Sequence, residues 1–562
     1  MDKRFFLALL LTAGVLVVTP IIFPRSVPAP RALVADSSVT TAVTPLGAPV
    51  TGGANIPASP ASGGAAIVAT GTTGTASSPQ VVADTVSVGT PLGSYAFSTL
   101  GAAPIAIQVD SYPALNGKGG RVVLKHGRES LLRYRVVTTR DTIAIDRVAF
   151  THKGGTAADG SPTLTFVGTS GSTRTTISYV FSRDNYLASA RVTVEGITGP
   201  AFLLVDLPTG LDTQEADSAV DIQNLAYSVK PVTQGARGVP FTKLDEGEKK
   251  LEAGPLSWAV MKSKYFIVGL LAVKDGKPFA EADIEGGVRS GKRATRGIAT
   301  VVMPLDNGAA AFEIYAGPLS WLRLLKLGRD FETANPTGGF LQPVVQPFAT
   351  IVMRMLLGLK KAVNLNYGWV IVIFGVAVRL IMWPLNQSAM RSALKMQRIQ
   401  PELQEVQTKF KSDPQKQQSE IMRVYKEHGM SPFSAFTGCL PALIPMPVLM
   451  ALFYVFQNTI EFRGVPFLWL HDISLHDPLY ALPLAMGASM YLMSWISLRN
   501  APPNPQAKMM SYIFPVVLTV ALANSAAGLS LYYTVQNLAA LPQQWLIANE
   551  RSKAVQPVKP VT

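Results

Sequence analysis

Cysteine, histidine and charged residues are all scarce in this sequence. A single cysteine, Cys439, stands among 562 residues, so an intrachain disulfide, a multi-thiol metal site and a CxxC redox motif are excluded. The five histidines are scattered, and neither an HExxH nor a GxSxG motif surrounds them. Charged residues make up 15% of the chain and hydrophobic residues 48%, a composition too apolar for an ordinary soluble enzyme. We therefore expect a membrane protein with a soluble part, and no enzyme activity, cofactor or metal.

Acidic residues are missing from five long apolar stretches in the second half of the chain. We expect these stretches to cross the membrane, and they lie at 364–385, 433–458, 479–498, 509–527 and 528–548. A proton- or sodium-coupled transporter ordinarily needs intramembrane carboxylates or broken helices in matching halves. Their absence disfavours that class, and a small-solute channel or secondary transporter is kept as the alternative function.

The first 93 residues contain an apolar stretch and then a low-complexity stretch. Lys3 and Arg4 precede about 19 mostly apolar residues, a pattern that suits a signal peptide or a membrane anchor. We favour an anchor at 1–23, because the apolar run exceeds the usual length of a signal peptide core. Residues 24–93 consist mainly of Ala, Thr, Gly, Ser, Pro and Val, which is typical of a flexible linker.

Residues 94–345 have the pattern of a β-rich domain. Short segments such as TLTFVGT and ARVTVEGI alternate polar and apolar residues, with Gly, Asp or Ser between them, which predicts a large β-sandwich outside the cytoplasm. Residues 346–363 then place apolar residues on one side of a helix. This helix is expected to lie in the membrane interface, and the alternative is a helix that caps the β domain.

Arg379 is the one full charge well inside an apolar span. It belongs to the stretch Tyr367 to Pro384, which is close to the roughly 20 residues needed to cross a hydrocarbon core. An arginine near a helix centre costs on the order of 2.5–3.5 kcal/mol to insert, so a polar cavity is expected to receive it. The side chain could instead extend to the cytoplasmic interface, because Trp383 is only about 6 Å further along the helix axis.

Charge gives a prediction of the topology. The net charge of +14 comes from basic residues beside apolar spans and not from a basic cluster interleaved with aromatics, so we expect no specific nucleic-acid sequence as a partner. Residues 386–432 hold eight Lys and Arg against five acidic residues, which predicts a cytoplasmic helical hairpin. The hairpin is either a solvated charged coiled coil or a docking arm for a ribosome or nascent chain. With six spans, both termini are cytoplasmic, including the tail at 549–562.

Several motifs resemble those of the YidC family of bacterial membrane protein insertases. They are VRLIMWPL around Arg379, KMQRIQPELQEVQ in the hairpin, DPLYALPLAMG in the fourth span, GLSLYYTVQNL in the sixth, and the long run GCLPALIPMPVLMALFYVFQNTIEFRGVPFLWLHDIS through the third. The anchor, linker and external domain, with WAVMKSKYF, are similar to the Gram-negative branch of the family.

This resemblance implies an architecture and a function. The architecture would be an α-helical bundle with six transmembrane helices, comprising a five-helix core and the N-terminal anchor, plus a periplasmic all-β super-sandwich. The core would enclose a hydrophilic groove that holds Arg379, Tyr532, Tyr533 and Gln457. A polar residue often found one helical turn before the arginine in relatives is Gly375 here. The protein would insert proteins into the bacterial inner membrane and help them to fold.

The resemblance also implies partners. Nascent membrane proteins would be the clients, and the lipid bilayer, the ribosome and the Sec translocon would be the further partners. The hypothesis is that a client's short, often acidic tail enters the groove near Arg379 while its apolar helix passes along the third and fifth spans into lipid. Burial of apolar groups at about 0.8 kcal/mol per CH₂ would drive this step, so no ATP is needed.

Overall fold

The structure is a computed structural model, and it describes most of the chain after residue 82. The described residues are 83–274, 276–291, 293–336, 341–384, 387, 399, 402–403, 405–411, 413–428, 446–499 and 505–555. The anchor expected at 1–23 and nearly all of the linker expected at 24–93 lie outside them, as do Cys439 and parts of the hairpin. Residues Val81–Thr562 form one compact unit.

The β domain contains one small and one large antiparallel sheet. The small sheet has the order β1-β2-β3-β4, with β1 (Thr85–Thr90), β2 (Gly93–Ser98), β3 (Pro104–Pro113) and β4 (Arg121–Leu124). The path of the 14-stranded sheet is β6-β5-β11-β19-β16-β14-β15-β20-β10-β9-β8-β7, and β12 and β13 pair beside β14.

The strands of the large sheet run through the rest of the domain. They are β5 (Arg133–Thr138), β6 (Thr142–Ile143), β7 (Phe150–Thr156), β8 (Pro162–Ser170), β9 (Thr173–Phe181), β10 (Leu187–Glu195), β11 (Ala201–Asp206), β12 (Ala226–Pro231), β13 (Arg237–Pro240), β14 (Lys249–Lys262), β15 (Phe266–Ala272), β16 (Phe279–Gly286), β19 (Gly297–Pro304) and β20 (Ala309–Pro318). A separate two-stranded ribbon joins β17 (Arg289–Ser290) to β18 (Arg293–Ala294). Short helices α2 (Ser218–Gln223) and α3 (Trp321–Leu327) complete the domain.

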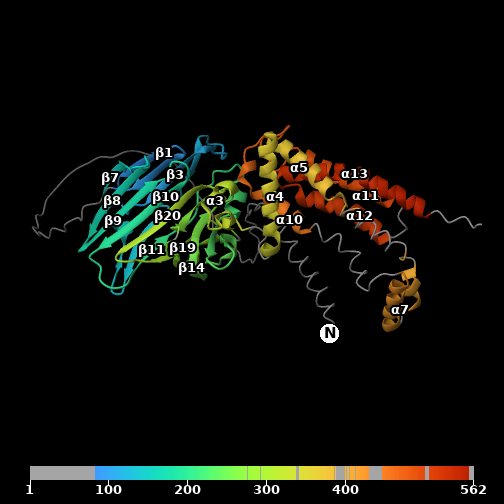
Figure 1. Cartoon of the computed structure of the whole chain (residues 1–562), viewed down its shortest axis with the longest axis horizontal. Helices are drawn as coiled ribbons and strands as arrows, with labels where there is room; N and C mark the ends of the chain where they lie inside the picture. The colour runs from blue at the N-terminus through green and yellow to red at the C-terminus, as the bar shows by residue number, and fades with distance from the viewer. Residues whose placement is uncertain are drawn as a thin grey trace, which may run out of the picture. The chain divides into compact units, whose positions relative to one another are not determined.

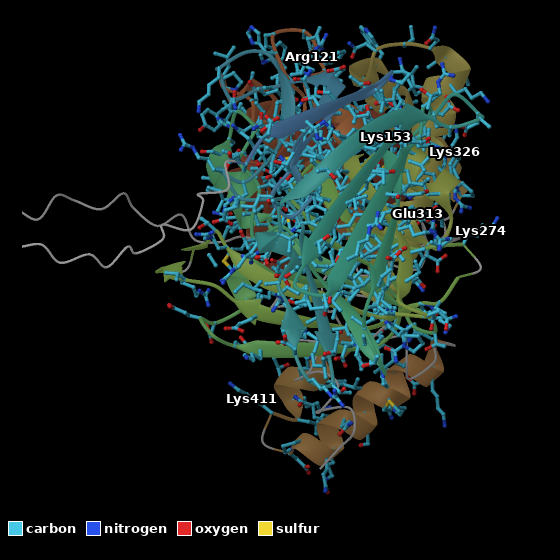
Figure 2. The ribbon with its side chains drawn as sticks, turned by 90° about the vertical axis from the view of Figure 1, so that its left-hand side faces the viewer. Arg121, Lys153, Lys274, Glu313, Lys326 and Lys411 are labelled. Atoms are coloured by element: carbon cyan, nitrogen blue, oxygen red, sulfur yellow. The ribbon has the colours of Figure 1, made fainter. Side chains whose placement is uncertain are left out.

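The two sheets share one aromatic core, which confirms the predicted β-sandwich. The Phe97 ring of β2 lies 5.8 Å from that of Phe166 in β8 and 4.7 Å from that of Tyr179 in β9. All three side chains are fully buried, as expected for inward-facing positions of packed sheets. Charged side chains such as Arg121, Lys153 and Lys326 stay at the surface (Figure 2).

The β domain begins earlier than the sequence pattern predicted. Strand β1 starts at Thr85 and β2 at Gly93, so the linker boundary at residue 93 was wrong. The segment TVSVGT has the small-residue composition of the preceding linker, which hides its alternating pattern. Pairing with β2, from Thr85 opposite Ser98 to Thr90 opposite Gly93, makes it a strand. Edge strands of this kind depend on their partner more than on intrinsic propensity.

Seven helices are described after the β domain, within the limits of the described residues. They are α4 (Gln342–Val363), α5 (Tyr367–Ile381), α7 (Pro414–Glu427), α10 (Met446–Asn458), α11 (Ala481–Leu498), α12 (Pro505–Leu522) and α13 (Ala527–Val555). Among the described residues, α11 alone is long and apolar enough to cross a membrane, and α4 with α5 meets the same test as a pair bent by 117°. The count of six spans therefore stays a prediction.

Helix α13 is the centre of the helical part. It packs against α5, α11 and α10, and α11 also packs against α12 (Figure 1). The break between α12 and α13 falls at residues 523–526, close to the predicted boundary at 527. Helix α13 continues to Val555, so the predicted tail from residue 549 is helical at its start.

Helix α4 has features of both predicted alternatives, a helix in the membrane interface and a helix that caps the β domain. It begins at Gln342, four residues before the predicted start, with a proline in its first turn. Val352 and Leu356 are buried, and Arg354 lies over the Trp321 ring of α3 at 5.8 Å. Ile351 is 53% exposed, which suits contact with lipid. The helix thus packs on the β domain and on α10 while keeping an apolar face outward.

The hairpin has a small core of its own. Ile399 and Leu403 of the first arm contact Val424 and Tyr425 of α7, and all four side chains are buried. The Asp413 carboxylate accepts a hydrogen bond from the Lys416 backbone N–H at 3.1 Å and so caps α7.

The segment 459–477, which joins α10 to α11, contacts both the helices and the β domain. The Phe462 ring lies 5.4 Å from the Phe456 ring of α10 and 5.4 Å from the Tyr367 ring of α5. On the other side, Ile460 is buried in the same core cluster as the β-domain residues. The backbone N–H of Gly528 donates to the Ile473 carbonyl at 2.9 Å. This segment therefore fastens the β domain to the ends of the helices.

Arg463 makes the strongest of these contacts. Its Nε donates to both carboxylate oxygens of Glu215 at 2.9 Å, and its Nη1 donates to the Pro113 carbonyl at 2.9 Å. The Arg463 and Glu215 side chains are only 1% and 7% exposed. Burial raises the pKa of the Glu215 carboxyl above its ordinary value, although Arg463 opposes this shift. Loss of either partner would leave the other charge buried and unpaired.

We predict that Arg463→Ala destabilises the junction by about 3–5 kcal/mol, the usual cost of removing one partner from a buried ion pair. Thermal unfolding of the purified protein in detergent, with limited proteolysis of the β domain, measures this loss. The control is Lys277→Ala, which breaks the exposed pair of Lys277 with Asp306 and should cost at most about 1 kcal/mol. Equal unfolding temperatures for the two variants would contradict a stabilising role for Arg463.

Candidate functional site

Arg379 lies in the last turn of α5 and its side chain is directed at α13. Its Nη2 donates a hydrogen bond to Oε1 of Gln543 at 2.7 Å, and Nε2 of Gln543 donates to the Trp383 carbonyl at 3.2 Å. Gln543 is only 2% exposed, so this contact is made inside the bundle. The guanidinium is therefore held where α5 contacts α13, and Gln543 links it to the Trp383 carbonyl near the end of α5. Both the polar cavity and the extension toward the cytoplasmic interface stay predictions.

No carboxylate balances the charge of Arg379 in the described part of the chain. Its hydrogen-bond partner among these residues is the neutral side chain of Gln543. Its Nε is buried and has no hydrogen-bond partner there. A half-buried guanidinium with an unsatisfied donor is costly unless another polar group can reach it. This site can therefore accept an anionic or hydrogen-bonding group.

Tyr532 is the aromatic centre of the site. Its ring is fully buried between Phe374 of α5, at 5.8 Å, and Phe456 of α10, at 5.9 Å. Tyr533 is half-buried, and its ring meets that of Tyr532 edge to face at 5.6 Å. Of the two tyrosines, Tyr533 is thus the more accessible, while Tyr532 joins three helices.

Gln457 is not brought to Arg379. It lies one residue from the end of α10 and is half-buried, and the described residues give it no hydrogen bond to Arg379, Tyr532 or Tyr533. Its place in the predicted groove remains a prediction.

Gln543 is the site residue that sequence reasoning missed. Residues 532, 536 and 543 are four and then seven positions apart, so Tyr532, Gln536 and Gln543 fall on one face of a helix. The glutamine pair QQ inside the apolar run of α13 was the available signal.

A second row of polar side chains follows α13 where it meets α11. Nδ2 of Asn537 donates to Oγ of Ser489 at 3.0 Å, and Oγ of Ser497 donates to Oε1 of Gln544 at 3.2 Å. Helix α13 therefore presents polar groups to α5 and to α11, which a helix surrounded only by lipid would not do.

Gly375 permits the close approach of α5 to α13. A Cβ atom at this position would lie 3.2 Å from Cγ1 of Val535 and 3.6 Å from Cδ2 of Tyr532. The position where relatives often carry a polar residue is thus filled by the neighbouring helix.

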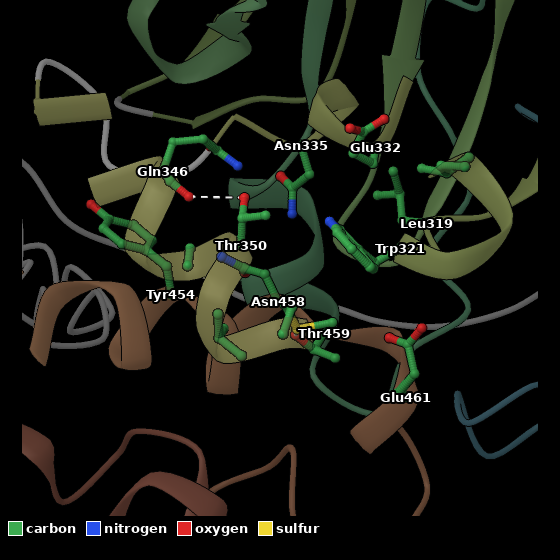
Figure 3. A pocket seen from close by; sticks show the side chains of 14 residues that line it. Leu319, Trp321, Glu332, Asn335, Gln346, Thr350, Tyr454, Asn458, Thr459 and Glu461 are labelled. Carbon is green, nitrogen blue, oxygen red and sulfur yellow. Dashed lines mark hydrogen bonds between the residues drawn. The ribbon is translucent and has the colours of Figure 1, made fainter. Parts of the chain in front are cut away.

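A cavity of about 60 Å³ lies elsewhere, between α3, α4 and the end of α10 (Figure 3). Trp321, Gln346, Thr350, Asn458 and Glu461 are among its lining residues. It contains none of the predicted groove residues and is too small for a client segment.

The chain is similar to known proteins along most of its length. A family model described as "60Kd inner membrane protein" matches residues 358–554, and one described as "YidC periplasmic domain" matches residues 85–351. The second match starts at the first residue of β1, in agreement with the corrected boundary of the β domain.

Curated relatives carry the same description. "Membrane protein insertase YidC" of Anaeromyxobacter sp. (strain Fw109-5) is 33% identical over 337 residues, which cover 59% of this chain and 58% of the relative. The protein of that name from Chlorobaculum tepidum is 30% identical over 397 residues, which cover 66% of this chain and 64% of the relative. The chain therefore spans about three fifths of the length of these relatives.

A solved structure is similar over a longer stretch but more weakly. The "Active YidC insertase crystal structure with the first transmembrane domain resolved" is 19% identical and covers 82% of this chain and 92% of that chain, with a TM-score of 0.32. This score is too low for any residue position to be transferred.

We predict that Gly375→Leu destabilises the contact between α5 and α13 by roughly 1–3 kcal/mol, because the new side chain overpacks Val535 and Tyr532. Thermal unfolding in detergent measures the effect. Gly358→Leu in α4 is the matched control, since a Cβ there has nothing within 4 Å. If both variants unfold at the temperature of the parent protein, the close packing at Gly375 is not a constraint.

Proposed function

Because the chain belongs to the YidC family, we propose that it inserts newly made proteins into the bacterial inner membrane and assists their folding. It is an inner membrane protein with a periplasmic β-sandwich domain. The observation that carries the proposal is the half-buried charge of Arg379, which has a neutral partner, Gln543, and no carboxylate partner among the described residues.

Arg379 acts on the polar end of a client. The short tail that precedes a client's first apolar helix has to leave water, and this is the costly part of insertion. An acidic tail is attracted by the positive charge of Arg379, whose side chain is partly exposed. The membrane potential adds about 2.3 kcal/mol per 100 mV for each negative charge moved outward.

The polar face of α13 continues this path, and the proposed groove runs along it. Tyr533 and Gln457 are proposed to line the groove, and Tyr532 to support its wall from within the aromatic cluster. The client's apolar helix leaves along the third and fifth spans into lipid, driven by about 0.8 kcal/mol for each CH₂ group buried. No step requires a nucleotide, a cofactor or a metal.

The hairpin is proposed to receive clients near the ribosome. Lys409, Lys411, Lys416 and Lys426 are all exposed on its described arms. Such a basic surface suits a polyanionic partner such as ribosomal RNA. Cooperation with the Sec translocon, six transmembrane spans and cytoplasmic termini are further parts of the proposal, supported by the resemblance to the family.

A small-solute channel or secondary transporter is the competing class. Its test is solute flux through proteoliposomes that contain the purified protein, since an insertase of this design gives no flux. A periplasmic scaffold is a third class, and it would be favoured if the β domain alone replaced the whole protein in cells.

We predict that Arg379→Ala fails to support insertion of single-span clients with acidic tails in cells depleted of the native insertase. Arg379→Lys should retain part of the function, because it keeps the charge and loses the fixed hydrogen-bond geometry. Protease protection of the client tail measures insertion. Lys326→Ala, which removes an exposed charge of the β domain, is the control for a change of net charge. Unimpaired insertion of several such clients by Arg379→Ala would exclude an essential charge at this site.

A further inference from the structure

Two arginines in the helical part of the chain are held in opposite ways. Arg463 is buried against the carboxylate of Glu215, which neutralises it. Arg379 is held by the carboxamide of Gln543, which carries no net charge. A carboxamide oxygen orients a guanidinium through a hydrogen bond but leaves its full positive charge in place.

The second hydrogen bond of Gln543 shows why an amide fits here. Its Nε2 donates to the backbone carbonyl of Trp383, which lies beyond the last residue of α5. This bond turns Oε1 toward Arg379 and fixes the amide between the two groups. A glutamate in this place could accept from Arg379 but, when ionised, could not donate to the Trp383 carbonyl. Only a side chain with one acceptor and one donor at this distance satisfies both partners.

The two side chains of this hydrogen bond differ in burial. Gln543 is almost completely inaccessible, whereas Arg379 is half-buried and its Nε has no partner among the described residues. The shielded glutamine thus fixes the guanidinium on one side, while the Arg379 side chain as a whole stays partly exposed.

We propose that Gln543 is a positioning residue that holds Arg379 while keeping its charge available, and that this selects clients with acidic tails. The inference deepens the proposed function and rests on it. It adds that the partner of Arg379 has to be neutral, because a carboxylate at position 543 would compete with the acidic groups of the client for the same guanidinium.

The test compares two clients that share one apolar helix and differ only in their tails, which carry two aspartates or two asparagines. The full-length protein is supplied as the parent, Gln543→Glu or Gln543→Met, and insertion is measured by protease protection. Gln543→Glu should lower insertion of the aspartate client by about tenfold, since a hydrogen-bonded charge interaction of about 1.4 kcal/mol corresponds to that factor. Insertion of the asparagine client should change by less than about twofold, on the same scale.

Gln544→Glu is the matched control for an added charge in α13. This neighbouring side chain meets Ser497 of α11 rather than Arg379, so the ratio between the two clients should stay at the parent value. Gln543→Met removes both hydrogen bonds of Gln543 without adding charge. It should reduce insertion of the aspartate client more than that of the asparagine client, and it keeps the proposal testable if Gln543→Glu fails to accumulate in the membrane.

The outcomes separate this inference from the proposed function. If the parent protein inserts neither client, the proposed function fails, and if Arg379→Ala inserts the aspartate client as well as the parent does, the proposed role of Arg379 fails. If Arg379→Ala is impaired while Gln543→Glu and Gln543→Met both match the parent, only the positioning role of Gln543 is overturned. An equal loss for both clients in the two Gln543 variants would indicate a purely structural role and would also overturn it.

Discussion

The contact between α5 and α13 depends on placing one guanidinium between apolar helices, with no carboxylate beside it among the residues that the structure describes. Arg379 lies in the last turn of α5, where a half-buried charge is costly unless polar groups receive it. The chain meets this cost with a neutral hydrogen-bond partner on α13, with the aromatic cluster around Tyr532, and with Gly375, which lets α5 approach α13 closely. Each of these features serves the contact between α5 and α13, where the charge is held.

At the end of the helical bundle that meets the β domain, the buried arginine is paired with a carboxylate. Arg463 is fully paired and buried, and the segment 459–477 contacts the sandwich on one side and the helices on the other. A paired charge in this position fixes structure, whereas Arg379 has no carboxylate partner among the described residues. The two arginines therefore separate a structural junction from the candidate functional site within one chain.

The sequence pattern predicts whether most segments form strands or helices, but it does not predict the residues at which these elements begin and end. The alternating polar and apolar segments predicted the sandwich that the paired strands form. The start of β1 was missed because TVSVGT resembles the linker and becomes a strand only through its pairing with β2. The start of α4 was missed by four residues because the helix has a proline in its first turn and another, Pro347, in the next, which weakens the helical signal of the sequence.

The sequence by itself determined the class of protein, the place of the β domain and the isolation of Arg379, because hydropathy, alternation and missing acidic residues are properties of the chain alone. The tertiary structure determined which side chain forms a hydrogen bond with Arg379. Residues 379 and 543 are 164 positions apart, and nothing in either local pattern pairs them. They meet because Gly375 and the aromatic cluster bring α5 against α13, so the partner of the arginine is fixed by packing between distant helices.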